Sequence, residues 1–186
     1  CKLPITVNDT LNNWYYRTKM ALQYFVWRRG FMATPTIAIQ ALTKSQPDLE
    51  TPDFRLQLSH ISGADRSETS HGMTKGLTAD NFSGFSLQAF QLHPKSRGSI
   101  HIRSKNPDDL PIINANYLTD KHDKKAVVIA LRLLRKLAQQ PALQELISRE
   151  VRPGAELTSN EDLLEYAKHC GHTCWHSVST CKMGTD

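Results

Sequence analysis

Alternating apolar and polar side chains in the middle of the chain constrain its fold most strongly. From Phe54 to Ser59, three apolar residues alternate with three polar ones. Because successive side chains of a strand point to opposite faces, this pattern predicts a strand with one buried face. Residues 84–93 predict a second strand and residues 99–104 a third, and the turn between them, which contains Gly98, predicts that they form a hairpin.

Helical periodicity occupies both sides of this strand region. After residues 8–10, which offer capping oxygens, apolar residues recur at three- and four-residue spacing as far as Gly30, which predicts an amphipathic helix. Between Asp120 and Ala138 an apolar stripe, with basic residues in its C-terminal half, predicts the longest helix of the chain. Antiparallel strands followed by grouped helices predict an α+β fold.

Turn residues and caps assign the remaining segments. Residues 31–52 contain three prolines and little periodicity, so they are predicted to be mostly loop, and residues 61–81 are predicted to form a long surface excursion. Pro141 predicts the start of a short helix that continues to Glu150. Residues 158–161 have the form of a capping box, which predicts a further helix after them.

The composition excludes several classes of protein. Of the 186 residues, 39% are hydrophobic and 22% charged, which is typical of a folded globular domain and not of a disordered or fibrous chain. No apolar run approaches the roughly 20 residues of a membrane-spanning helix, so we expect no integral membrane segment. The net charge of +5 is spread over separate short runs, which argues against a nucleic-acid partner.

Reactive side chains are densest between His169 and Gly184, where three cysteines and three histidines occur. One interpretation is a metal site, but no paired Cys-x2-Cys element is present and we expect none. A second is that Cys170 and Cys174 pack as small apolar residues at the end of a helix. A third is that one histidine acts as a base in alcohol oxidation, which requires a proton acceptor beside a hydride-accepting cofactor.

Trp175-His-Ser-Val-Ser-Thr-Cys-Lys-Met-Gly184 resembles a motif of the glucose-methanol-choline (GMC) oxidoreductases, an aromatic residue followed by His-Pro-x-Gly-Thr-Cys-Lys/Arg-Met-Gly. The segments 92–104, 111–118 and 140–143 resemble further blocks of that family in their usual order, and residues 7–11 resemble the opening of its substrate domain. The resemblance is greatest to the choline-dehydrogenase-like branch and weakest over residues 31–81.

The resemblance implies a fold, a cofactor and a site. It implies a mostly antiparallel sheet with helices packed on one face, and a single substrate-binding domain over residues 1–186 of a longer flavoenzyme. It implies that His176 is the catalytic base, that Trp175 and His176 lie against FAD, and that a small-molecule alcohol is the substrate. None of the nine glycines has the Gly-x-Gly-x-x-Gly spacing of a dinucleotide site, so we expect FAD to be held mainly by a separate FAD-binding domain of the same polypeptide.

Two departures from the family motif leave an alternative open. Ser177 stands where the family usually has proline, and Ser179 where it usually has glycine. The alternative is therefore a non-catalytic relative or an interaction module. The family's second catalytic His or Asn is expected beyond Asp186, and the chain alone is expected to be inactive. An intracellular protein, soluble or peripherally bound to a membrane, is the expected setting.

Overall fold

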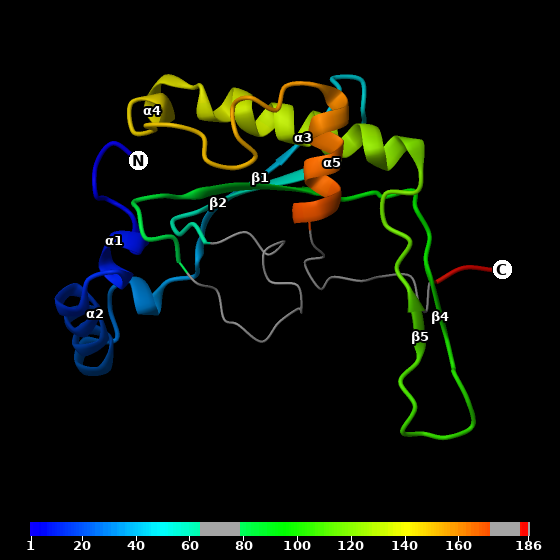
Figure 1. The fold of residues 1–186 in the computed structure, drawn as a ribbon, viewed down its shortest axis with the longest axis horizontal. Helices are drawn as coiled ribbons and strands as arrows, with labels where there is room; N and C mark the ends of the chain where they lie inside the picture. Colours follow the sequence, from blue (N-terminus) through cyan, green and yellow to red (C-terminus); the bar gives the residue numbers. More distant parts are fainter. Residues whose placement is uncertain (64–78, 172–182, 186) are drawn as a thin grey trace.

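The computed structural model describes residues 1–63, 79–171 and 183–185 of the chain. A three-stranded antiparallel sheet with the order β1-β2-β3 forms its centre, and a separate two-stranded antiparallel sheet, β4-β5, extends from it as an arm (Figure 1). The mixture of helices and antiparallel sheets confirms the predicted α+β class. The strands are β1 (Ile37–Thr43), β2 (Phe54–Ser59), β3 (Ser86–Gln91), β4 (Ser99–His101) and β5 (Ile112–Asn114).

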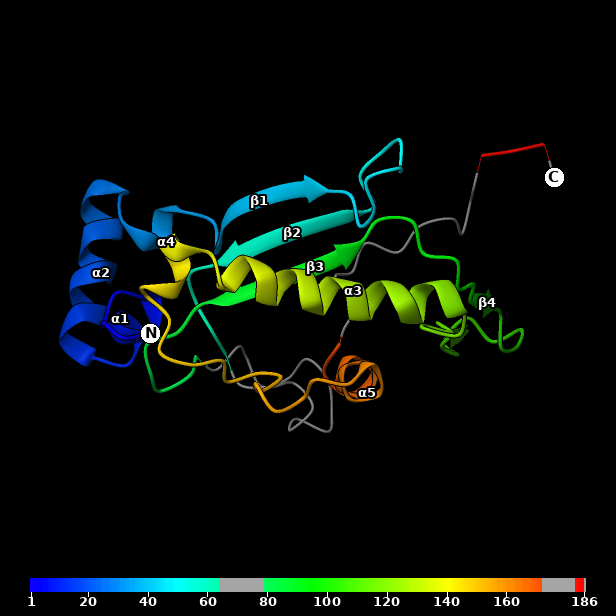
Figure 2. The same ribbon diagram turned by 90° about the horizontal axis from the view of Figure 1, so that it is seen from above.

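Helices lie on both sides of the central sheet, but in different ways. Figure 1 shows α3 and α4 on one side, whereas α1, α2 and the β4–β5 arm extend from the other. Seen from above in Figure 2, α3 runs along the sheet beside β3, and α5 lies beyond that edge, against α3. The helices are α1 (Val7–Leu11), α2 (Trp14–Trp27), the short 3-10 turn η1 (Phe31–Ala33), α3 (Lys121–Ala138), α4 (Pro141–Gln144) and α5 (Asn160–Cys170).

The core lies between α3 and the central sheet. Phe54 and Leu56 of β2 are buried against Ala126 and Ala130 of α3. Alanine at both helix positions lets the helix approach the sheet closely, while larger residues such as Leu133 pack around the edge of the contact. The alternation in β2 and the apolar stripe of the helix therefore meet, and both predicted elements are confirmed.

The predicted hairpin between the second and third strands is wrong. β3 pairs only with β2 among the described strands, and β4 pairs with β5. The physical reason is Asp123 of α3, whose carboxylate accepts hydrogen bonds from the backbone N–H groups of Lys95 (2.8 Å) and Ser96 (2.7 Å). This contact holds the intervening turn at the start of α3, and the chain leaves the sheet there.

The segment predicted to be mostly loop contains strand β1, so that prediction is also wrong. Three prolines flank or precede it, and Ile-Ala-Ile-Gln-Ala-Leu-Thr lacks a clear alternation. Pairing with β2 along its whole length supplies the order that the local sequence does not.

The predicted N-terminal helix is two helices, and its second part is not amphipathic. Asn13 interrupts the helix, because its side chain caps α2 by accepting a hydrogen bond from the N–H of Tyr15 (3.0 Å). No residue of α2 is buried, since apolar side chains occur all round it. Two other boundaries also differ from the prediction: α4 ends at Gln144, and Ser159 rather than Thr158 caps α5.

Candidate functional site

The predicted catalytic and cofactor-binding residues, His176 and Trp175, lie outside the described residues. What the structure describes is the helix that leads to them. Ser159 caps α5, and the helix ends at Cys170, where the N–H of Gly171 donates to the carbonyl of Ala167 (2.9 Å). A Cβ on residue 171 would stand 2.3 Å from that carbonyl oxygen, so only glycine fits this exit from the helix.

The face of the central sheet opposite α3 is polar. Cross-strand partners point to the same face, and on this face Gln40, Gln57 and Gln88 form one row across all three strands. Ser59 and Ser86 form a second cross-strand pair. A sheet face that merely met solvent would leave its central residues exposed, but Gln57 is only 5% exposed.

Gln57 has an unsatisfied amide. Its side chain makes no hydrogen bond to any residue in the ranges 1–63, 79–171 and 183–185, although buried amides normally find partners. Together with the neighbouring glutamines, it offers both donors and acceptors to a polar group placed against the sheet. We therefore take the row Gln40–Gln57–Gln88, with the adjoining Arg55, as the candidate site, and call it the glutamine face.

Arg55 carries the only charge among the strand residues on the glutamine face. Its guanidinium carbon lies 5.0 Å from the ring centroid of Phe90, its cross-strand partner, in a cation–π contact. Its Nε is buried and is without a partner in the described part of the chain. The face is thus electropositive, and the aromatic ring that could have accepted a cationic ligand is already covered by a cation.

Two polar clusters hold the chain around this face. Asn8, completely buried in α1, donates from its side chain to the carbonyls of Ser62 (3.0 Å) and Phe82 (3.1 Å). It was predicted to offer a capping oxygen, but it ties two distant segments together instead. Asp80 is paired with Arg152 (2.9 Å); burial alone would raise the pKa of Asp80, but the hydrogen bonds and charge of Arg152 lower it below its usual value.

The predicted long excursion is largely outside the described residues, but its two ends are placed. Gly63 and Ala79 form an isolated antiparallel bridge, and the N–H of Asp80 donates to the carbonyl of Ser62 (3.0 Å). The two ends of residues 64–78 therefore meet at the cluster that Asn8 and Asp80 organise.

The turn before β4 has a structural role, as the sequence predicted. The guanidinium of Arg97 donates to the carbonyls of Pro94 (2.8 Å) and Ser96 (3.1 Å), within its own turn. Gly98 lies so close to β5 that a Cβ there would be 2.3 Å from the carbonyl oxygen of Asn114. These contacts fix the direction in which the β4–β5 arm leaves the body.

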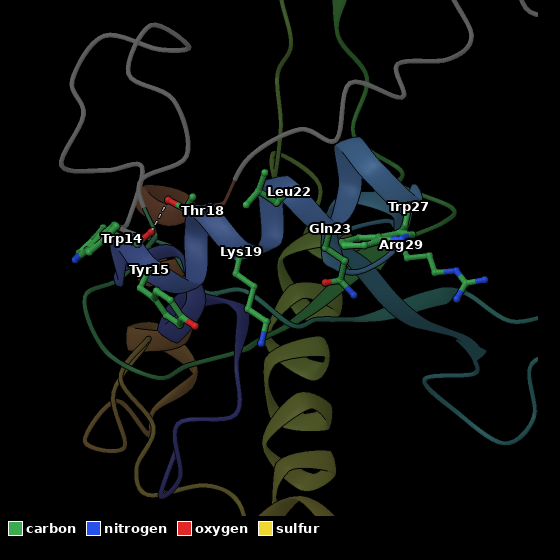
Figure 3. Close-up of a pocket in the computed structure, with 8 residues that line it drawn as sticks. All are labelled: Trp14, Tyr15, Thr18, Lys19, Leu22, Gln23, Trp27 and Arg29. Atoms are coloured by element: carbon green, nitrogen blue, oxygen red, sulfur yellow. Dashed lines mark hydrogen bonds between the residues drawn. The ribbon is translucent and has the colours of Figure 1, made fainter.

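A second surface feature lies on α2. Figure 3 shows a shallow, open groove of about 710 Å³ along this helix, between the rings of Trp14, Tyr15 and Trp27. Lys19 and Arg29 contribute the basic groups that border it. The groove is far from chemistry that the described residues could perform, since its polar groups are cationic or amide side chains.

Metal and membrane-spanning sites find no support in the described structure. Among these residues no three His, Cys, Asp or Glu side chains gather as metal ligands would. Of the five ligands considered for zinc, only Cys170 is described. No helix in the described ranges has both the length and the hydropathy needed to cross a bilayer.

Sequence reasoning missed the glutamine face. The signal was present, because the polar half of the β2 alternation consists of Arg55, Gln57 and Ser59, without the mixed charges typical of a solvent-facing strand. It was not recognisable as a site until the register brought Gln40 and Gln88 beside Gln57.

Comparison with known proteins relates the chain to alcohol-oxidising flavoenzymes. It is 28% identical to an oxygen-dependent choline dehydrogenase from Vibrio vulnificus (strain YJ016), over 100% of this chain and 31% of the relative. It is 33% identical to choline oxidase from Arthrobacter globiformis, over 78% of this chain and 26% of the relative. The chain therefore spans less than a third of the length of these relatives.

A solved structure supports the fold. The crystal structure of pyridoxine 4-oxidase from Mesorbium loti matches with a TM-score of 0.64 and 23% sequence identity, over 79% of this chain and 28% of that one. At this identity the likeness concerns the fold alone. The family model described as GMC oxidoreductase matches residues 94–186, the whole second half of the sequence, and the chain therefore belongs to the GMC oxidoreductase family.

Proposed function

We propose that this chain forms the substrate-side part of an FAD-dependent alcohol oxidoreductase. The observation that carries the proposal is the family match over residues 94–186, which includes the motif around His176. Relatives named choline dehydrogenase, choline oxidase and alcohol dehydrogenase support the reaction class. In this proposal residues 1–186 act as one substrate-binding domain, which joins an FAD-binding domain of the same polypeptide.

His176 is proposed as the catalytic base. Oxidation of an alcohol to a carbonyl removes the hydroxyl proton and a hydride from the carbon that bears it. A bound flavin supplies the hydride acceptor. The neutral imidazole of His176 takes the hydroxyl proton, and Trp175 borders the same site; a positioned base of this kind contributes about 10²–10⁴-fold.

The residues of the described face fit contact with a polar ligand better than with solvent. Gln57 is buried with an unpaired amide, and the glutamines on either side extend the same row. We propose that the glutamine face is the wall of the domain that looks toward the substrate. The face does not fit FAD binding by itself, because the chain has no glycine-rich phosphate-binding turn.

The charge of Arg55 bears on the choice of alcohol. A quaternary ammonium group is usually bound by open aromatic faces or by carboxylates, whereas this face offers a guanidinium stacked on its phenyl ring. We propose that an uncharged polar alcohol is preferred over choline, although choline-oxidising enzymes are among the relatives.

The proposal is tested by anaerobic stopped-flow measurement of flavin reduction in the full-length protein. Choline, simple primary alcohols and polyols are compared, and His176→Ala is expected to slow reduction by the best of them about 10²–10⁴-fold. The matched control is His169→Gln, since His169 is exposed on α5 and only its ring contacts the backbone of Glu165 (2.8 Å). Near-normal reduction by His176→Ala removes that residue from the mechanism, and failure of every alcohol to reduce the flavin rejects the reaction class.

The role of Arg55 is tested separately. Arg55→Gln is expected to improve kcat/KM for choline relative to a neutral polyol by roughly tenfold, which corresponds to about 1.4 kcal/mol of lost repulsion. An unchanged ratio, with reduction still dependent on His176, would reject the proposed wall but leave the reaction class intact.

A further inference from the structure

The helix α2 and the turn η1 form an exposed apolar surface at one end of the molecule (Figures 1 and 2). Nine large apolar side chains of residues 14–32 are exposed there, with Trp14 at 73% and Phe25 at 66%. Six of the fourteen residues of α2 are aromatic. A contiguous apolar area of this kind on a folded domain normally marks a surface that something else covers.

The same segment carries the whole charge excess of the chain. Residues 10–47 contain five basic residues and no Asp or Glu, and the net charge of the complete chain is +5. The rest of the sequence is therefore neutral overall. The five basic residues of this segment are Arg17, Lys19, Arg28, Arg29 and Lys44.

Basic and aromatic groups are mixed within one surface rather than separated. In Figure 3 Lys19 extends from the helix between Tyr15 and Trp27, and Arg29 lies beside the Trp27 end of the groove. The guanidinium carbon of Arg28 lies 5.1 Å from the ring centroid of Tyr24. The inner side of the helix, by contrast, has only half-buried residues such as Met20 and Ala21.

This combination selects among possible occupants. A covering protein surface would have to match aromatic rings and at the same time supply acidic partners for the basic groups, because this segment contains none. An anionic phospholipid surface meets both demands. Trp and Tyr rings favour the boundary between headgroups and acyl chains, and Lys and Arg favour lipid phosphates at the same depth.

We propose that α2 and η1 attach this protein to the surface of membranes that contain anionic phospholipids. The helix would lie in the plane of the interface, with its aromatic side toward the acyl chains and its basic groups at the phosphates. This inference does not depend on the proposed oxidation reaction. It requires only the exposure and the charge of residues 14–32.

The test is co-sedimentation of the full-length protein with vesicles, either of phosphatidylcholine alone or with roughly one third phosphatidylglycerol. Binding is expected to be at least about tenfold stronger to the anionic vesicles and to decrease as salt is added. Equal or absent binding to the two kinds of vesicle overturns the proposal. That result is expected if another part of the polypeptide, or a second copy, covers α2.

Substitutions assign the binding to this surface. The double variant Lys19→Gln, Arg29→Gln is expected to bind anionic vesicles roughly 25-fold less well, at about fivefold for each basic residue. The matched control is Lys105→Gln, Lys121→Gln, which removes the same charge from exposed positions elsewhere and should bind like the unaltered protein. Equal weakening by both double variants would show a nonspecific charge effect and would also overturn the proposal.

A second variant removes the aromatic contribution without changing the charge. Trp14→Ala is expected to weaken binding to anionic vesicles several-fold and to leave the salt dependence unchanged. Trp14 is largely exposed, so the substitution should not disturb folding, which circular dichroism checks. Unaltered binding by this variant would reject insertion of the helix.

Discussion

The helices α3 and α2 have similar sequence signatures but opposite surroundings. Both are long, both contain many apolar residues, and a cap at the first residue starts each of them. The apolar stripe of α3 is buried against β2, with Ala126, Val128 and Ala130 all inaccessible, whereas no residue of α2 is buried. Periodicity thus shows where a helix forms, but the partner that covers its apolar side has to be found in the structure.

The difference extends to the two faces of the central sheet. The face toward α3 is apolar and holds the core, and the opposite face carries the glutamines and Arg55. We interpret the first side as the source of stability and the second as the side on which binding occurs. Substitutions of comparable size on the two sides should therefore differ sharply in their effect on unfolding.

The largest effect is expected at Phe54, which is completely buried between β2 and α3. Phe54→Ala should lower the free energy of unfolding by about 3–5 kcal/mol, because it removes a buried ring and leaves a cavity against Ala126 and Ala130. Urea unfolding followed by tryptophan fluorescence measures this change. A loss under about 1 kcal/mol would mean that the contact between the helix and the sheet is not the core of the domain.

A smaller effect is expected at Asp123, which joins α3 to the turn before β4. Burial alone would raise the pKa of Asp123, but hydrogen bonds from the backbone of Lys95 and from the backbone and side chain of Ser96, followed by that of Gln91, lower it to about 2. A carboxylate with a lowered pKa stabilises the fold fully above its unfolded value of 3.8, and this contribution is lost as the pH falls through about 2.

Asp123→Asn should therefore cost about 2 kcal/mol at pH 6, since roughly two pKa units separate the folded and unfolded values and each is worth about 1.4 kcal/mol. The difference between the variant and the unaltered protein should shrink between pH 4 and pH 2. Urea unfolding at several pH values measures it, with Asp108→Asn at an exposed turn as the control. A difference that stays constant over this range would mean that the charge of Asp123 is not what anchors the turn.

The elements that sequence reasoning located correctly are those whose local pattern and packing agree. β2 alternates and is buried on its apolar side, and α3 has both a cap at Asp120 and an apolar stripe. β1 could not be predicted, because its order comes from pairing with β2 and its own sequence does not alternate. The arm was misassigned because the hydrogen bonds of Asp123 join residues 28 positions apart, which no local pattern records.

The candidate site divides in the same way. The motif around His176 was recognisable because neighbouring residues in the sequence carry it. The glutamine face is built from three strands, and its members are separated by 17 and 31 positions in the chain. Only the register of the sheet brings them into one row.

The smallest effect on stability is expected at Phe25, and it gives the sharpest contrast with Phe54. The two residues are chemically identical, but Phe25 is 66% exposed on α2 and Phe54 is fully buried. Phe25→Ala should change the free energy of unfolding by no more than about 0.5 kcal/mol, because exposed substitutions away from packed contacts rarely do more. The same urea unfolding experiment measures it, beside Phe54→Ala. A cost above about 2 kcal/mol would show that α2 is covered by protein in the folded molecule, and its apolar surface would then belong to the core rather than to a binding surface.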